Sequence, residues 1–272
     1  MPAFAGGFLY VLSAIIISGT LKGAPTVGVL EGLGPAFNGV ANPPVSPRAP
    51  EVKFISHHAF TLIAGSTLAA IAVGGLTMIL LLLVDATRFR RPTTWAAARP
   101  LVLVGGISVA IVSVAHQVIS AIETHKFAVG HDFSNHAVNQ ALTESTINVV
   151  VEYIDLLAGL ALAAGVIATV INALRAGLIP RWMMILGIFS GLLIFLPLGG
   201  AELQVVPALW MVMMGILYAG RWPNEEPPAW AAGEARPWTS PARVRAAKGD
   251  AVVPVPTPPV QAGTSRKRRK GR

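Results

Sequence analysis

The chain has 272 residues, of which 53% are hydrophobic and only 12% charged, and it contains no cysteine. A soluble domain of this size carries about a quarter charged residues, so the composition excludes an ordinary water-soluble fold. Without cysteine, disulfides, thiolate metal ligands and cysteine nucleophiles are excluded as well. We therefore expect an all-α fold, a polytopic bundle of membrane helices.

Six apolar segments predict six transmembrane helices, because about 20 helical residues span the hydrocarbon core of a bilayer. They cover residues of about 4–20, 59–84, 101–122, 147–174, 182–198 and 202–220. No basic residue precedes the first segment and no clear cleavage site follows it. We expect it to be a retained helix, with a cleaved signal as the alternative.

The last two helices are predicted by dividing one long apolar stretch. Residues 182–220 number 39, and as a single helix they would be about 58 Å long, roughly twice the hydrocarbon thickness. Pro197-Leu198-Gly199-Gly200 stands at the middle of the stretch, and such residues turn the chain. The stretch is therefore predicted to be a hairpin of two short helices.

The distribution of basic residues predicts the orientation, because short Arg-rich loops mark the cytoplasmic side. The loops 85–100 and 175–181 are of this kind, whereas the 123–146 loop carries only Lys126. The residues concerned are Arg88, Arg90, Arg91, Arg99, Arg175 and Arg181. With six spans, both termini are cytoplasmic and the Gly/Pro-rich loop 21–57 lies outside, although its own basic residues go against this. Richness in Ala, Gly, Pro and Arg favours a bacterial source and hence the bacterial inner (plasma) membrane.

The C-terminal part, 221–272, is predicted to be a disordered basic tail. It carries eleven Lys and Arg against four Asp and Glu, whereas residues 1–220 carry ten against nine. Repeated prolines remove backbone donors, so this part cannot form a packed core. Its last residues can contact anionic lipid, with a simple topology anchor as the alternative and nucleic acid as an unlikely partner. The candidate lipid contacts are Arg266, Lys267, Arg268, Arg269, Lys270 and Arg272.

Polar side chains on the third and fourth predicted helices mark a candidate intramembrane site, because ionisable groups are rare inside a bilayer. Helical spacing puts Asn148, Glu152 and Asp155 on one face, and it puts His116 and Glu123 on one face of the other helix. Counted from the outer ends of the two helices, His116 and Glu152 lie about 8–9 Å deep and Asp155 about 12 Å. The complete candidate set is His116, Gln117, Glu123, Asn148, Glu152, Asp155 and Glu202.

Three interpretations of these polar groups stay open. They can hydrogen-bond between helices as structural links. Glu152 and Asp155 can titrate in an ion or proton path, with His116 as a relay. His116, Glu152 and Asp155 can ligate a metal, whereas a bis-histidine haem needs a second His at matching depth. No cofactor or catalytic residue can be assigned, since no metalloprotease or nucleophile motif occurs.

Two classes of function follow from these interpretations. The first is a non-enzymatic membrane protein, transporter-like or an accessory subunit of a membrane complex. The alternative is a membrane-embedded metal- or haem-dependent enzyme with a site on the outer half of the third and fourth helices. The expected partners are the lipid bilayer and other membrane subunits or a second copy. Small residues such as Gly187 and Gly191 let helices approach closely, either inside the bundle or in such intermolecular contacts.

The segment Ala176-Gly-Leu-Ile-Pro-Arg-Trp-Met-Met-Ile-Leu-Gly-Ile-Phe-Ser-Gly191 resembles a pattern of uncharacterised bacterial polytopic integral-membrane proteins of the domain-of-unknown-function type. In those proteins a Gly-Leu-x-Pro-Arg-Trp turn leads into a glycine-containing helix, often followed by a Trp- and Pro-rich tail. The tail of this chain is similar around Trp222 and over 228–238. The resemblance implies a polytopic architecture and transfers no activity and no catalytic residue.

Overall fold

Long apolar helices form the body of the protein in the computed structural model, which describes residues 2–28, 45–195, 204–222 and 227–236. The four longest are α1 (Pro2–Leu21), α4 (Ala59–Arg90), α5 (Ala98–Val129) and α7 (Thr146–Ala176). Among the described residues these four elements supply the candidate membrane spans by length and apolar composition. No strand occurs in the described ranges, so the prediction of an all-α fold is confirmed there.

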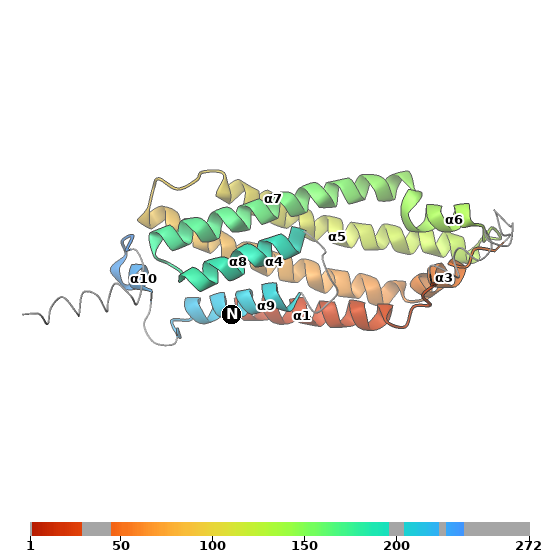
Figure 1. Cartoon of the computed structure of the whole chain (residues 1–272), viewed down its shortest axis with the longest axis horizontal. Coiled ribbons are helices and arrows are strands. Elements are labelled where there is room, and N and C mark those ends of the chain that lie inside the picture. The colour runs from red at the N-terminus through yellow and green to blue at the C-terminus, as the bar shows by residue number, and fades with distance from the viewer. Residues whose placement is uncertain (1, 29–44, 196–203, 223–226, 237–272) are drawn as a thin grey trace, which may run out of the picture. The chain divides into compact units, whose positions relative to one another are not determined.

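The helices pack as a ring in which each one contacts its neighbours (Figure 1). The order around the ring is α1, α4, α5, α7, α8 and α9, and α9 returns to α1. The closing pair is α8 (Arg181–Phe195) and α9 (Val205–Tyr218). The main core lies inside this ring, and its largest fully buried side chain is Trp210.

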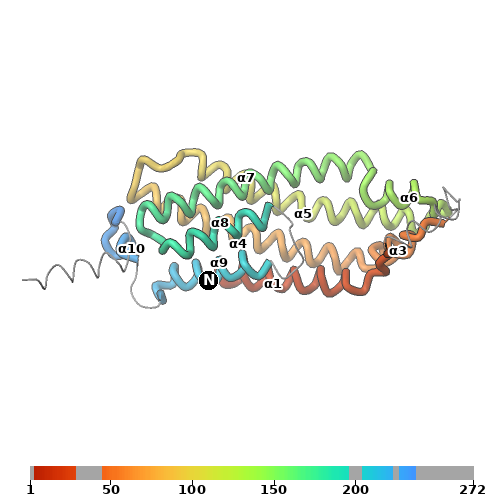
Figure 2. Tube along the Cα trace, viewed as in Figure 1, coloured from red at the N-terminus to blue at the C-terminus, as the bar shows by residue number. Residues whose placement is uncertain are grey.

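The closing pair is short, as the sequence predicts for 182–198 and 202–220. With 15 and 14 residues, α8 and α9 are about 22 and 21 Å long, against about 30 Å for a hydrocarbon core. Both lie in the half of the bundle next to α10, whereas α4, α5 and α7 continue through the other half (Figure 2). Residues 196–203 lie outside the described ranges. The described residues contain four helices that are long and apolar enough to cross a membrane, and six spans remain a proposal.

The turn from α7 to α8 explains the Gly-Leu-Ile-Pro-Arg-Trp segment in physical terms. Gly177 ends α7 with φ of 79°, a left-handed conformation that favours glycine. The backbone N–H of Leu178 donates to the carbonyl of Ala173 at 2.9 Å, which completes a Schellman cap. Leu178 and Ile179 are then fully buried, and α8 begins directly after Pro180.

We call the end of the bundle that contains this turn the basic end. It collects the ends of α4, α7 and α9 and the beginnings of α5 and α8, with arginine side chains from each. These are Arg88, Arg90, Arg91, Arg99, Arg175, Arg181 and Arg221. The prediction that the Arg-rich loops lie on one side of the bundle therefore agrees with the structure.

The opposite end, which we call the distal end, is helical where the sequence predicts loops. The 21–57 segment contains α3 (Ala49–His57), and the 123–146 segment contains the end of α5, α6 (Asn135–Asn139) and the π-helix η1 (Gln140–Glu144). Apolar side chains hold these pieces together, namely Ala49, Val52, Phe127, Val138 and Ala141. The loop predictions are wrong here because small apolar residues spaced along a polar sequence suffice for short packed helices.

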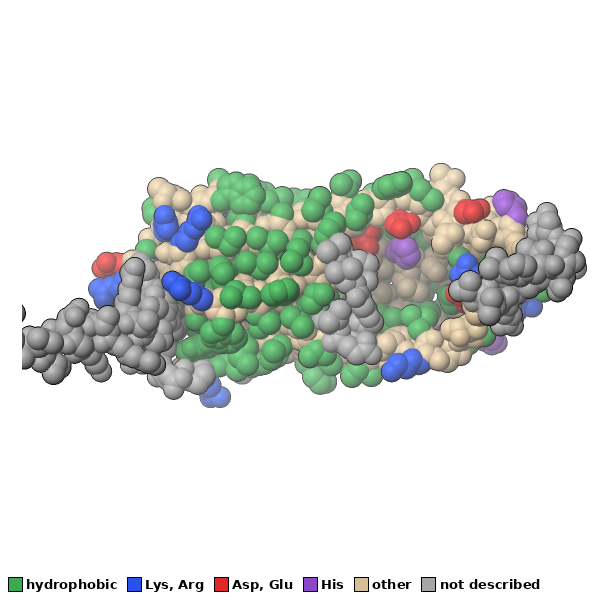
Figure 3. All heavy atoms as spheres, viewed as in Figure 1, with side chains coloured by type: hydrophobic (Ala, Val, Ile, Leu, Met, Phe, Trp, Pro, Cys, Tyr) green, Lys and Arg blue, Asp and Glu red, His purple; other side chains and the backbone are tan. Residues whose placement is uncertain are grey.

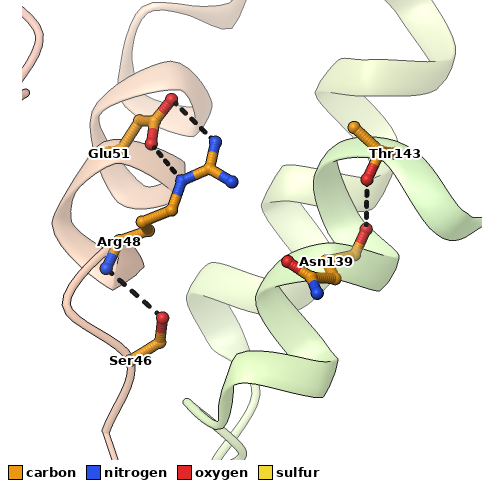
Figure 4. Close-up of polar contacts among 5 residues, drawn as sticks. All are labelled: Ser46, Arg48, Glu51, Asn139 and Thr143. Atoms are coloured by element: carbon orange, nitrogen blue, oxygen red, sulfur yellow. Dashed lines mark hydrogen bonds and ion pairs between the residues drawn. The ribbon is translucent and has the colours of Figure 1, made fainter. Parts of the chain in front are cut away.

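Polar contacts order the first turn of α3 at the distal end (Figure 4). The Arg48 guanidinium donates to both carboxylate oxygens of Glu51, at 2.9 and 3.3 Å. The backbone N–H of Arg48 donates to Ser46 Oγ at 3.3 Å. A backbone bond of 2.7 Å from Ser46 to Phe133 then joins this segment to the loop before α6.

The beginning of the predicted tail is also structured. Residues 227–236 contain α10 (Pro228–Ala232) and belong to the same compact unit as the bundle. Ala229 is fully buried, and Trp230 Nε1 donates to the carbonyl of Leu178 at 2.9 Å. The predicted boundary at 220 therefore does not hold for 227–236, because apolar residues among the prolines pack on the bundle. The predicted lipid contacts from Arg266 to Arg272 lie outside the described residues.

Candidate functional site

Two glycines set the register between α5 and α7, the helices that carry most of the predicted polar site. A Cβ atom at Gly105 would overlap the backbone of Leu162, and one at Gly165 would lie 2.8 Å from the backbone nitrogen of Val102. The two helices are antiparallel and their backbones touch at these points. Glycine is required because any side chain would force the helices apart.

This register brings three of the predicted residues to similar heights. His116 follows Gly105 by eleven residues and lies about 16 Å beyond the contact with Leu162. On α7, Glu152 lies about 15 Å and Asp155 about 10 Å beyond the same contact. His116 is within electrostatic range of Asp155. The structure therefore places the predicted third and fourth helices side by side, with these groups near one another.

The acidic residues continue the face of α7 that packs against α8. In the basic half, Val170 and Val166 of this face meet Gly187 and Gly191 of α8, and Gly159 faces Phe195. Asn148, Glu152 and Asp155 follow at intervals of three and four residues, so they lie on the same face farther out. The described residues of α8 end at Phe195, one turn before Asp155.

As a consequence, the charged groups are exposed. Glu152, Asp155 and His116 are all exposed, and none makes a hydrogen bond or ion pair with another described residue. The space-filling view shows acidic and histidine side chains beside a hollow in the surface, beyond the hydrophobic face over α8 and α9 (Figure 3). Hydrogen-bonded links between helices would instead bury these groups.

The other predicted site residues have different environments. Glu123 Oε1 accepts a 2.9 Å bond from Lys126 Nζ, so its charge is compensated within α5. Asn148 is buried and Gln117 half-buried, and both fit structural roles. Glu202 lies outside the described residues. The site that the geometry assembles is therefore His116, Glu152 and Asp155.

The metal hypothesis finds no preformed ligand set in the structure. Among the described residues, no group of three or more His, Asp or Glu side chains could hold a metal ion. His116, Glu152 and Asp155 are thus neighbours without the convergent geometry that a tetrahedral site requires. The metal and haem interpretations stay predictions and gain no support from this arrangement.

An open pocket of about 410 Å³ lies at the distal end between α5 and the α6–η1 segment. Its polar lining includes Glu123, Lys126, His131, Asp132 and Gln140. The backbone N–H of Ser134 donates to Asp132 Oδ1 at 2.9 Å, and bonds from Ser134 lower the pKa of this carboxyl group. The two acids are therefore already engaged by Lys126 and by the turn.

The residues that position the site through helix packing, rather than through charge, were not predicted from the sequence. The approach at Gly105 and Gly165 fixes the level of His116 against α7. A Gly-Gly pair at 105–106 inside an apolar helix was a usable signal for a close helix contact.

The fold and the exposed acids define an all-helical protein with four helices that can cross a membrane and a polar site near one end of the ring. No family model, curated protein or solved structure matches the chain. Its function is therefore inferred from its own residues and geometry.

Proposed function

We propose that the protein is a transporter-like integral membrane protein that binds a cation or exchanges a proton at Asp155, with Glu152 and His116 beside it. The observation that carries the proposal is that Asp155 continues the α8-packing face beyond the described end of α8. The ring of helices thus closes in the basic half, while the distal half leaves the carboxyl group accessible. Transporters commonly place ion sites where a helix is interrupted at membrane depth.

The depth of the group supports this proposal. The exposed ion pair between Arg99 and Asp85 (3.3 Å) fits one boundary of the hydrocarbon. Asp155 lies about 20 Å from that level, and Glu152 and His116 about 25 Å, in a core of about 30 Å. Asp155 is then at the depth of the hydrocarbon, where ionisable side chains are rare and mark ion or proton pathways.

The neighbouring charges fit uptake of positive charge. Glu152 and Asp155 are one helical turn apart, and two carboxylates at that spacing repel each other when both are ionised. A proton or a bound cation relieves this repulsion, and the imidazole of His116 lies near enough to take part in the same site. Uptake at one acid therefore depends on the state of the other two groups.

The orientation, location and family belong to the same proposal. The Arg-rich basic end suits the cytoplasmic face of a bacterial inner membrane, with α8 and α9 as the fifth and sixth membrane helices. The N-terminus and the tail are then cytoplasmic. The Gly177 turn and the buried Leu178 and Ile179 give the Gly-Leu-Ile-Pro-Arg-Trp segment a structural role, which fits membership of the polytopic family that it resembles.

Thermal unfolding of the detergent-purified protein tests the site. Wild type is compared with Asp155→Asn over pH 5–8 and in a panel of Na⁺, K⁺, Mg²⁺ and Ca²⁺ at constant ionic strength. We expect stabilisation by protons or by one cation, about 2.7 kcal/mol at a hundredfold excess over Kd, that Asp155→Asn removes. Asp85→Asn is the matched control, since it removes an exposed carboxylate at the basic end.

Flux measurements complete the test. In proteoliposomes, we expect wild type and Asp85→Asn to carry a potential-driven proton or cation flux that Asp155→Asn and Glu152→Gln abolish while remaining folded. Equal responses of Asp155→Asn and wild type would leave the acids as structural groups and favour an accessory subunit. Stoichiometric metal or a Soret band that disappears in His116→Ala would instead support the enzyme alternative.

A further inference from the structure

We infer that the basic end holds a specific site for an anionic phospholipid, with Arg181 and Arg221 at the phosphate and the exposed face of α8 along an acyl chain. This inference is independent of the site at Asp155. The proposed lipid site cannot be recognised from the Arg-rich loops alone. It depends on a contact between two residues that are 40 positions apart in the sequence.

That contact is a stacked pair of tryptophans. The rings of Trp182, at the beginning of α8, and Trp222, just after α9, have centroids 5.7 Å apart and planes inclined by 19°. Each is preceded directly by an arginine, so the stack brings Arg181 and Arg221 to the same edge of the bundle. Both arginines are exposed, and neither bonds to another residue in the described part of the chain.

The chemistry of this edge matches a phospholipid headgroup. Two guanidinium groups bind the oxygens of a phosphate more selectively than ammonium groups do, because each presents a planar fork of donors. The indole ring has an apolar body with one polar N–H and therefore concentrates at the membrane interface. Trp182 is 47% exposed beside Trp222, which leaves its ring available to the glycerol region.

The acyl chain has a matching surface on the same helix. Ile185, Phe189 and Leu192 follow Trp182 at helical spacing and are 49%, 56% and 38% exposed. They form one continuous apolar stripe that runs from the arginines toward the middle of the bundle. Figure 3 shows basic side chains at the edge of the hydrophobic face that covers α8 and α9.

Charge decides which lipid fits. Eight described arginines gather at the basic end, namely the seven at the helix ends and Arg236. The acids described there are Asp85, which is paired with Arg99, and the exposed Glu234. A zwitterionic headgroup would place its own cation in this positive field, whereas a headgroup with net negative charge gains from it. The site therefore selects an anionic glycerophospholipid over phosphatidylcholine.

Native mass spectrometry of the full chain tests the site by counting bound lipid. The probes are dioleoyl-phosphatidylglycerol, dioleoyl-phosphatidylcholine and inorganic phosphate. We expect phosphatidylglycerol to bind wild type in preference to phosphatidylcholine, and the double substitution Arg181→Gln/Arg221→Gln to weaken that binding about tenfold or more. Arg91→Gln/Arg175→Gln is the control, since it removes the same charge from the same end without touching the stacked pair.

A second variant separates the lipid from a free anion. Phe189→Ala shortens the apolar stripe and leaves both arginines in place, so we expect weaker binding of phosphatidylglycerol and unchanged binding of phosphate. Equal losses in the two arginine double variants would overturn the proposal in favour of a diffuse positive field. Phosphate that binds as tightly as the lipid, or lipid binding without preference for the anionic headgroup, would overturn it as well.

Discussion

The basic half of the bundle has a closed, buried core and the distal half has exposed charged side chains, although α4, α5 and α7 run through both. In the basic half, α8 and α9 close the ring around fully buried side chains such as Trp210 and Met183, and α10 covers the end. In the distal half the same face of α7 carries exposed Glu152 and Asp155. Tight packing and accessible charge are therefore separated along the helices, as expected where function needs a less tightly packed region.

The largest expected effect on stability comes from removing a large buried side chain from the core of the basic half. Trp210 is fully buried and its Nε1 donates to the carbonyl of Met183 at 3.1 Å. We expect Trp210→Ala to lower the free energy of unfolding by about 3–5 kcal/mol, because a large cavity opens and a carbonyl loses its donor. Thermal unfolding in detergent, followed by circular dichroism, measures the loss.

The distal half supplies the control for this substitution. Phe60 is 84% exposed at the beginning of α4. Phe60→Ala removes an aromatic ring of similar size from a position without a packed environment, and we expect a change below about 1 kcal/mol. Comparable losses of unfolding free energy in the two variants would show that the two halves are packed equally tightly.

A second prediction concerns the close contact between α5 and α7 at Gly105. Gly105→Leu pushes a side chain into the backbone of Leu162, and we expect a destabilisation of about 3 kcal/mol with separation of α5 from α7. Gly74→Leu is the matched control, because no atom lies within 4 Å of a Cβ at Gly74. The amount of folded protein in size-exclusion chromatography and its melting temperature distinguish the two. An unchanged melting temperature and folded fraction in Gly105→Leu would mean that the register derived from this contact is incorrect.

A third, smaller effect is expected at the cover of the basic end. Trp230 donates to Leu178, lies edge-on to Tyr218 at 5.8 Å and has the Arg90 guanidinium 5.0 Å from its ring. We expect Trp230→Ala to release α10 with a loss of about 1–3 kcal/mol.

Hydrogen exchange of 227–236 and limited proteolysis of this segment by a protease of broad specificity measure the release of α10. Trp95→Ala, at a ring that is 55% exposed in the α4–α5 loop, should leave both readouts unchanged. Protection of 227–236 that persists in Trp230→Ala would show that the ring does not hold the segment.

The sequence predicts the elements of this fold well where a long apolar run decides the outcome. The predicted 147–174 agrees with α7 to within two residues at each end, and the centre of each long helix is correct. The ends are less well predicted, because α4 and α5 continue through charged residues to Arg90 and Val129. Helical hydrogen bonding persists beyond the apolar run as long as no proline or glycine interrupts it.

The candidate site was predictable only in part. Charge inside an apolar helix singles out His116, Glu152 and Asp155 from the sequence alone. Their relative level depends on a backbone contact at Gly105, which leaves no charge pattern in the sequence. Glu123 fits the same pattern as Asp155, yet Lys126 one turn later engages it. Periodicity gives the face of a helix, whereas the neighbour on that face is a property of the packed bundle.

The smallest predicted effect tests how loosely the distal half is held. In the Glu123–Lys126 pair the lysine side chain is 65% exposed and the carboxylate 17% exposed. Because the lysine is largely in water, we expect Lys126→Met to change the free energy of unfolding by less than about 1 kcal/mol. A double-mutant cycle with Glu123→Gln isolates the coupling between the two charges. A coupling well above 1 kcal/mol would mean that the distal half depends on specific charge contacts as firmly as the basic half depends on its buried core. Glu152 and Asp155 would then have to be treated as parts of a stabilising network rather than as accessible groups.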